Sequence, residues 1–182
     1  MSTFPRARRS QQGYDIEQVE DFLEDARRAY ATDVRAATAI DSSSIRRMSF
    51  TMQKGGYSPA HVDAALERLE EAFARREHER GVLEHGEAAW FAKVRERAQE
   101  ALEQLGRPDQ QRFRRVSRIS RGYRVAEVDR FAARIAEYLE DGPDMSTREV
   151  RTVQFDAQFG GYDEDEVDRL LDTVVSLMLA VR

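Results

Sequence analysis

The sequence predicts a mainly α-helical protein made of four repeats, each with a short extended segment, a Gly-Tyr turn and an amphipathic helix, arranged as two pairs. Charged residues make up 35% of the chain and apolar residues 41%, with ten glycines and four prolines among 182 residues, which is typical of a charged helical protein. A Gly-Tyr dipeptide also occurs four times, and each time apolar residues recur at helical spacing downstream.

The four Gly-Tyr segments form an internal repeat. They read "QGYDIEQVEDFL", "GGYSPAHVDAAL", "RGYRVAEVDRFA" and "GGYDEDEVDRLL". The first and third repeats have a phenylalanine nine residues before the glycine, at Phe4 and Phe113. The second and fourth have one six residues before it, at Phe50 and Phe155. The flanks therefore predict that an odd and an even repeat were duplicated together.

An extended segment precedes each Gly-Tyr pair. Apolar and polar residues alternate over residues 48–52 and again at residues 153–155, which predicts short strands with one apolar edge. Glycine then supplies the backbone freedom that a turn requires. We interpret the Gly-Tyr pairs as structural turn positions, namely Gly13, Tyr14, Gly56, Tyr57, Gly122, Tyr123, Gly161 and Tyr162.

A helix follows each turn. Asp15, Ser58 and Asp163 stand where an N-cap belongs, and Glu166 follows three residues after Asp163, as in a capping box. The third repeat has Arg124 at this position and lacks such a cap. We therefore expect helices to begin directly after the Gly-Tyr pairs.

The second helix is predicted to be the longest. It extends from about Pro59 to Leu105, with a break near Gly81 or Gly86. Residues 106–109, "GRPD", are the best linker candidate, and residues 140–147 separate the last two repeats.

Two domains follow from this reading. Residues 1–106 form pair one, with repeats at 1–40 and 41–75 and the long helix to about 105. Residues 107–182 form pair two, with repeats at 112–141 and 146–182.

No catalytic, metal or cofactor site is predicted. The chain has no cysteine, which excludes thiolate chemistry and is compatible with a reducing cytoplasm. The histidines, His61, His78 and His85, lack the spacing of a metal motif and are interpreted as surface residues. No serine stands in a G-x-S-x-G context and no phosphate loop occurs, so we expect no enzyme and no cofactor.

The net charge of −5 conceals a basic segment. Between residues 110 and 126 the chain has six arginines and no acid: Arg112, Arg114, Arg115, Arg118, Arg121 and Arg124. Such a surface could meet lipid phosphate or nucleic acid, or it could be a solvated strand face paired with acidic helices. A nucleic-acid-binding protein that uses Arg112 to Arg124 is therefore the alternative function.

Trp90 and Phe91 lie outside the repeats. Large aromatic residues at helical spacing usually face a core, and a docking patch for a partner protein is the alternative.

The order of an extended segment, Gly-Tyr, a polar run and Val-Asp or Val-Glu resembles the N-terminal domain of the DivIVA family of bacterial division and polarity scaffolds. The fourth repeat, "VRTVQFDAQFGGYDEDEVDRLL", is the nearest match. Four copies in one chain resemble the actinobacterial DivIVA-domain repeat proteins.

The resemblance implies a non-catalytic, self-associating cytoplasmic scaffold or adaptor, linked to cell division or polar growth. It also implies a parallel coiled coil and contact with anionic membrane at the septum or poles, made by a Phe-Arg pair just before the Gly-Tyr. Phe159 occupies the aromatic position and Arg121 the basic one, in different repeats, while Lys54 and Arg118 are further candidates for membrane or partner contact.

Two hypotheses follow. First, because an odd and an even repeat were duplicated together, we expect repeats to pair within the chain and imitate a pairing that the related scaffold domain makes between two chains. Second, Phe159 projects from the turn before Gly160 to contact lipid or a partner. The alternative is that Phe159 folds back over Phe155 and Tyr162 as part of the core.

Overall fold

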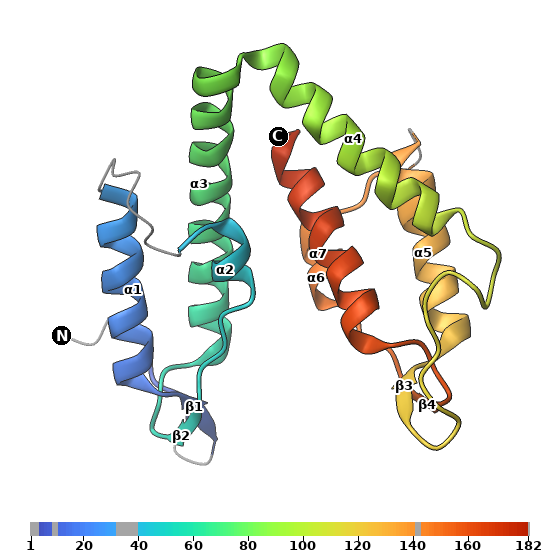
Figure 1. Ribbon diagram of the computed structural model, residues 1–182. Coiled ribbons are helices and arrows are strands. Elements are labelled where there is room, and N and C mark those ends of the chain that lie inside the picture. The colour runs from blue at the N-terminus through green and yellow to red at the C-terminus, as the bar shows by residue number, and fades with distance from the viewer. Residues whose placement is uncertain (1–3, 9–10, 32–39, 141–142, 182) are drawn as a thin grey trace. The chain divides into compact units, whose positions relative to one another are not determined.

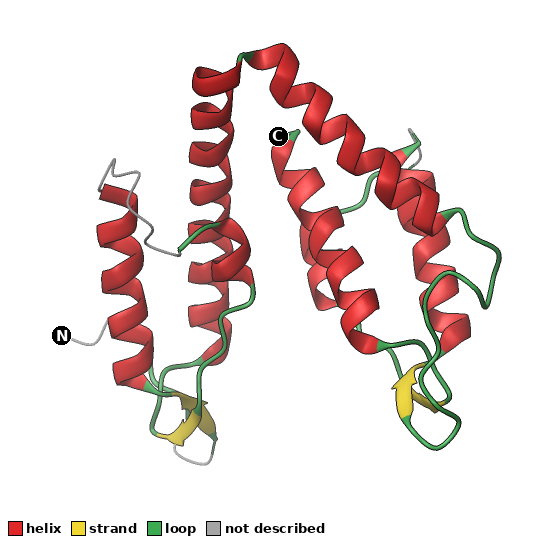
Figure 2. Cartoon of the chain, in the orientation of Figure 1, coloured by secondary structure: helices red, strands yellow, loops and turns green. Residues whose placement is uncertain are grey.

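The structure, a computed structural model, describes residues 4–8, 11–31, 40–140 and 143–181. The chain is mainly helical, which confirms the predicted class, and its strands are short (Figure 2). It divides into two compact units, Met1–Glu77 (unit 1) and His78–Arg182 (unit 2).

Unit 1 contains helices α1 (Ile16–Ala31), α2 (Ser42–Arg46) and most of α3 (Pro59–His85). Strands β1 (Gln12–Tyr14) and β2 (Met52–Lys54) pair antiparallel, with Gln12 opposite Lys54. Both α1 and α3 start beside these strands and run side by side away from them (Figure 1).

The core of unit 1 lies between α1 and α3. Val19 and Val62 pack with Tyr57 at the strand end, and Phe22 and Phe73 pack with other apolar side chains further along the helices. These positions follow the predicted helical spacing, so the apolar stripe of each helix faces the other helix.

Unit 2 contains the end of α3 and helices α4 (Glu87–Leu105), α5 (Val125–Leu139), α6 (Thr147–Thr152) and α7 (Glu164–Ala180). Strands β3 (Arg121–Tyr123) and β4 (Ala157–Phe159) pair antiparallel, with Arg121 opposite Phe159. Helix α4 packs against α5 and α7, and α6 packs against α7.

The division between the units falls at Glu77, whereas the sequence placed the boundary at residue 106. Helix α4 causes the difference, because its residues Ala101 and Leu105 are buried. The Gln104 side chain also donates a hydrogen bond to Glu166 of α7 at 3.3 Å. Helix α4 therefore belongs to the core of unit 2.

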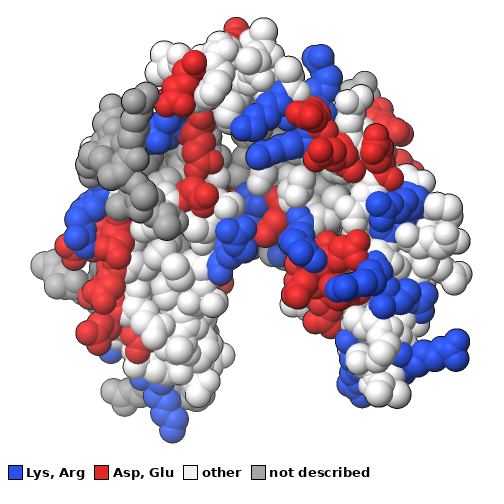
Figure 3. Space-filling model, viewed as in Figure 1, with Lys and Arg blue, Asp and Glu red and all other residues white. Residues whose placement is uncertain are grey.

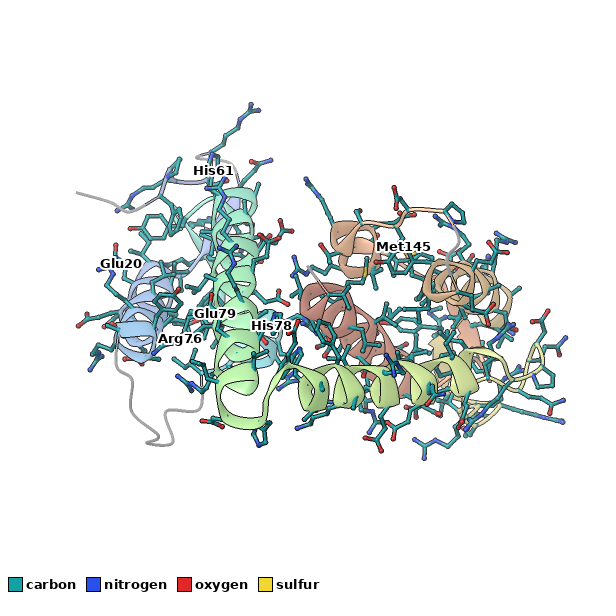
Figure 4. The ribbon with its side chains drawn as sticks, turned by 90° about the horizontal axis from the view of Figure 1, so that it is seen from above. Glu20, His61, Arg76, His78, Glu79 and Met145 are labelled. Carbon is teal, nitrogen blue, oxygen red and sulfur yellow. The ribbon has the colours of Figure 1, made fainter. Side chains whose placement is uncertain are left out.

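The long helix breaks at Gly86, one of the two predicted positions. Gly86 has φ 83°, which ends α3 before α4 begins. Gly81 stays inside α3 and meets the Trp90 ring, since a Cβ there would lie 2.3 Å from that ring. His78 stacks on Trp90 at 5.2 Å, close to the start of α4 (Figure 4). Trp90 is thus half-buried, and Phe91 remains 39% exposed.

The paired strands lie closer to the Gly-Tyr pairs than the predicted extended segments, residues 48–52 and 153–155. Each paired strand has three residues and lies next to its glycine, and the short helices α2 and α6 precede strands β2 and β4. Asp41 caps α2 by accepting a hydrogen bond from the Ser44 amide at 2.6 Å, and Ser146 caps α6. Local capping therefore forms helices where too few residues exist for a periodic signal.

The predicted N-caps are confirmed in the first and fourth repeats. Asp15 accepts a hydrogen bond from the Gln18 amide at 3.0 Å, and Asp163 accepts one from the Glu166 amide at 3.1 Å. The Glu166 side chain accepts instead from the Arg114 amide at 2.8 Å, so it links α7 to the segment before β3. Arg124 begins α5 without a side-chain cap.

Candidate interaction site

The Gly-Tyr pairs meet two by two where the strands of each unit cross. In unit 1 the amides of Tyr14 and Tyr57 each donate to the other's carbonyl oxygen, both at 2.9 Å. In unit 2 the amides of Tyr123 and Tyr162 make the same exchange, again at 2.9 Å. We call these contacts the unit 1 crossing and the unit 2 crossing.

The glycines are required by this close approach. A Cβ on Gly13 would lie 2.3 Å from the Tyr57 carbonyl oxygen, and one on Gly122 would lie 2.1 Å from that of Tyr162. Gly56 and Gly161 meet the opposite backbone in the same way. None of these four has positive φ, so the sequence-based explanation by turn freedom is corrected: backbone contact excludes any side chain.

The second tyrosine of each crossing is buried and reaches a carboxylate on the helix that follows the first Gly-Tyr of its unit. Tyr57 and Tyr162 are both 0% exposed. The Tyr57 hydroxyl donates to Glu20 of α1, which Figure 4 labels, and the Tyr162 hydroxyl donates to Asp129 of α5 at 2.9 Å. These bonds join each Gly-Tyr to the helix of the other repeat.

The first tyrosine of each crossing makes the reciprocal contact with the helix that follows the second Gly-Tyr of its unit. Tyr14 hydrogen-bonds to Asp63 of α3, and the Tyr123 hydroxyl donates a long bond of 3.4 Å to Asp168 of α7. All four acids, Glu20, Asp63, Asp129 and Asp168, stand seven residues after the glycine of their own repeat. The constant spacing of seven residues is the sequence signal for these four partners, which periodicity and motifs did not identify.

Asp129 has more partners than its unit 1 counterpart. It is 6% exposed and accepts from the Tyr162 hydroxyl, from the Gln110 amide at 2.8 Å and from Arg112 Nη1 at 3.1 Å. Gln110 adopts φ 68°, which is rare for a residue with a side chain. Glu20, by contrast, is exposed. The crossings therefore share a backbone and differ in the surroundings of the carboxylate.

Burial shifts the ionisation of these groups. Loss of hydration, together with the hydrogen bond to Asp129, raises the pKa of Tyr162 to about 12. Loss of hydration and the nearby Asp168 carboxylate raise the pKa of Tyr123 to about 12 as well. The same desolvation raises the pKa of the Asp63 and Asp168 carboxyls.

Most arginines of the predicted basic surface have hydrogen-bond or ion-pair partners within unit 2. Arg112 pairs with Asp109 and Asp129, Arg114 with Asp163, Arg115 with the Gly160 carbonyl, and Arg124 with Glu127 and Asp156. Arg118 and Arg121 have no acidic partner among the residues that the structure describes. Four of the six arginines therefore have hydrogen-bond or ion-pair partners within unit 2.

Arg121 and Phe159 come together although they belong to different repeats. They are opposite each other in the β3–β4 register, and the Arg121 guanidinium carbon lies 4.9 Å from the Phe159 ring centroid. Phe159 is 59% exposed and the nearby Ile119 is 88% exposed. We call Arg118, Ile119, Arg121 and Phe159 the unit 2 tip. Figure 3 shows Lys and Arg side chains gathered at the end of unit 2 that carries β3 and β4.

Phe159 does not fold back into the core, which excludes that alternative. The Phe155 ring packs against Tyr123 at 5.2 Å and Phe131 at 6.0 Å, and Tyr162 packs against Phe113 at 5.2 Å. The places beside Phe155 and Tyr162 are therefore filled, and Phe159 points to solvent.

The corresponding end of unit 1 has no aromatic side chain next to a cation among its described residues. Lys54 lies opposite Gln12, and the exposed apolar residue of β2 is Met52, at 48% exposure. Arg6 donates to the Gly55 carbonyl at 3.0 Å. At this end the exposed apolar side chain does not contact a cation, whereas at the unit 2 tip Arg121 lies against the Phe159 ring.

No group of three or more potential metal ligands occurs within the described ranges. His61 contacts Ser58 at 3.0 Å and His78 stacks on Trp90, so neither meets a carboxylate cluster. A pocket of about 550 Å³ beside α5 includes Asp129 in its lining, but that carboxylate is already bonded to its neighbours.

Comparison of the chain with protein-family models, with curated proteins and with solved structures found no match in any of the three. Among the described residues, no helix has the length and apolar character needed to cross a membrane.

Proposed function

We propose that this chain is a non-catalytic, DivIVA-like interaction module in which four repeats pair two by two within the chain, and that the unit 2 tip contacts an anionic membrane. The pairing of β1 with β2 and of β3 with β4 supports the repeat arrangement, because each joins an odd repeat to an even one. The identical exchange of tyrosine backbone bonds in both units supports it further.

The contact between Arg121 and Phe159 carries the membrane proposal. An aromatic ring and a cation, supplied by different repeats, lie side by side at an exposed tip. Burying one such apolar side chain in lipid contributes about 1.5–3 kcal/mol, and each cation near an anionic surface adds about 1 kcal/mol. Phe159 and Ile119 with Arg118 and Arg121 therefore suit reversible, peripheral binding.

The nucleic-acid alternative has less support. Four of the six arginines in the basic segment are bonded to groups of unit 2. Arg118 and Arg121 remain for phosphate contacts, and two contacts give only a shallow salt dependence of binding. The exposed Ile119 and Phe159 suit an apolar medium better than a duplex surface.

Vesicle co-sedimentation of the full chain tests the membrane contact. We expect binding to vesicles that contain phosphatidylglycerol and none to pure phosphatidylcholine. Phe159→Ala should weaken binding about tenfold or more, because the tip loses its largest apolar group. Met52→Ala is the matched control, since it removes an exposed apolar side chain from the strand end of unit 1. Circular dichroism should show both variants folded.

Two results would contradict this contact. The first is absence of binding by the parent chain at low salt. The second is equal binding by the parent and Phe159→Ala. Duplex DNA binding with a steep salt dependence, lost on changing Arg114, Arg115 and Arg118 to Ala, would favour the alternative instead.

The adaptor role is tested in cells. We expect a fluorescently tagged copy, expressed in the organism that encodes it, to concentrate at the septum or the poles. A uniformly diffuse signal for a full-length, folded copy would argue against a link to division or polar growth.

A further inference from the structure

Two serines occupy the exposed turn that leads into the unit 2 tip. Ser117 and Ser120 are both exposed, the Ser120 amide donates to the Ser117 carbonyl at 2.9 Å, and their hydroxyl oxygens lie 2.8 Å apart. The hydroxyls bond to each other and not to the core. A group added to one of them would therefore displace no structural contact beyond this pair.

Several other serines are used by the fold. The Ser42 hydroxyl donates to Glu77 at 2.7 Å on a buried side chain. Ser44 and Ser146 take part in capping α2 and α6, and Ser176 donates to a carbonyl within α7. Modification at these positions would remove a cap or a buried bond.

Charges before Ser117 have the order that basic-directed protein kinases recognise. Arg114 and Arg115 stand three and two residues before it. Acidic kinase clefts select substrates by such charge patterns. The Arg114 side chain is 71% exposed, so it is accessible from solvent although it pairs with Asp163.

Unit 1 contains the same order of residues in a different setting. Arg46 and Arg47 stand three and two residues before Ser49, which is also exposed. The Arg46 side chain, however, is only 8% exposed and pairs with the buried Glu70 at 2.7 Å. A kinase could reach Arg46 only after breaking a buried ion pair. Ser117 and Ser49 thus have the same sequence pattern, but only the arginine three residues before Ser117 is accessible.

We propose that Ser117 is a phosphorylation site and that its phosphate weakens the membrane contact of the unit 2 tip; the second part rests on the proposed function. The Ser117 hydroxyl oxygen takes the γ-phosphoryl group of ATP in a protein kinase, its proton passes to the catalytic base of the kinase, and ADP leaves.

The expected effect is electrostatic. A phosphoserine carries about −1.5 to −2 charges near pH 7. It would stand beside the Ser120 hydroxyl, in the turn that holds Arg118 and precedes Arg121. The phosphate would offset both cations and be repelled by anionic lipid. Vesicle binding should weaken about tenfold or more.

Phosphate mapping tests the site. The full chain is incubated with ATP and an arginine-directed serine/threonine kinase, and modified residues are identified by mass spectrometry over time. We expect Ser117 to be modified about tenfold or more faster than Ser49, and Ser117→Ala to abolish that product. Ser10, which lies outside the described residues, also follows two arginines, Arg8 and Arg9. Mass spectrometry distinguishes a phosphate on Ser10 from one on Ser117. An unmodified Ser117, or equal rates at Ser117 and Ser49, would overturn the proposal.

Vesicle binding before and after phosphorylation tests the consequence. Ser117→Ala, treated identically with the kinase, is the control and should bind like the parent. If unmodified and phosphorylated chains bind equally, the regulatory part is wrong and the proposed function stands. If neither form binds, the proposed function fails and the regulatory part fails with it, while mapping alone decides whether Ser117 is a phosphorylation site.

Discussion

Units 1 and 2 have the same backbone crossing and different side chains around it. Both exchange two tyrosine backbone hydrogen bonds at 2.9 Å, and both exclude any Cβ at the glycines. Yet Tyr57 of unit 1 donates to the exposed Glu20, whereas Tyr162 of unit 2 donates to the buried Asp129. Backbone contact leaves no room for substitution at the crossing, while its surroundings and the strand ends can differ between units.

The helices after the second Gly-Tyr of each unit show a related difference. Nine and sixteen residues after the glycine, α7 has Leu170 and Leu177, which are 6% and 5% exposed. The same positions of α3 are Ala65 and Ala72, which are half-buried. Helix α7 also packs against α4, so unit 2 has an additional helix with which leucines can form a larger core.

Substitution of the crossing glycines should have the largest effect on stability. Gly122→Ala places a Cβ 2.1 Å from the Tyr162 carbonyl oxygen, so the strands must separate. We expect the free energy of unfolding of unit 2 to fall by about 3 kcal/mol or more. Urea unfolding followed by the fluorescence of Trp90, the single tryptophan, measures it in unit 2.

Gly13→Ala should have a similar effect on unit 1, followed by far-ultraviolet circular dichroism, because its Cβ meets the Tyr57 carbonyl oxygen at 2.3 Å. Gly55→Ala is the control: its φ of 72° costs about 1–2 kcal/mol, but no atom lies within 4 Å of the added carbon. If Gly55→Ala proved as damaging as the crossing variants, backbone conformation and not close approach would explain the glycines.

Removal of the buried tyrosine hydroxyls should lower the free energy of unfolding less than the glycine substitutions do, and by different amounts in the two units. Tyr162→Phe leaves the buried Asp129 without one donor and should cost about 2 kcal/mol of unfolding free energy. Glu20 is already exposed, so water can replace the hydrogen bond that Tyr57→Phe removes, and about 0.5–1 kcal/mol is expected. Urea midpoints of both variants check this, and equal losses would show that carboxylate burial does not matter.

Alkaline pH should lower the stability of unit 2. The pKa of Tyr162 and of Tyr123 is about 12 in the folded chain, above the ordinary value of 10.0. Between these values the unfolded chain releases protons that the folded chain retains, so the stability of unit 2 is complete below pH 10 and declines toward pH 12. Melting temperatures measured across this range check the decline. It should be smaller in Tyr162→Phe, and an unchanged slope would contradict the assignment.

The sequence predicted the helices and several of their ends, because apolar spacing, Asp15, Asp163 and Gly86 act through neighbours in the chain. It could not reveal why Gly13 is glycine, since the atom that excludes a side chain belongs to Tyr57, far along the chain. Periodicity also missed α2 and α6, which are too short to show it.

The candidate site was predictable only in parts. Phe159 and Arg121 were both identified from the sequence as candidates for contact, but in separate repeats, so their proximity was not predicted. The β3–β4 register places them opposite each other, and register depends on hydrogen bonds between distant strands. The boundary at residue 106 differed for a similar reason, because the burial of Leu105 depends on a tertiary contact of α4.

Strands β3 and β4 pair although they come from two repeats, and both repeats are encoded by one gene. Partners within one chain pair without a second copy, so their pairing does not depend on how many copies a cell makes. In a symmetric pair of separate chains every mutation appears on both sides. Here a codon change at Phe159 leaves Arg121 untouched, so the aromatic and the basic side of the tip can change independently.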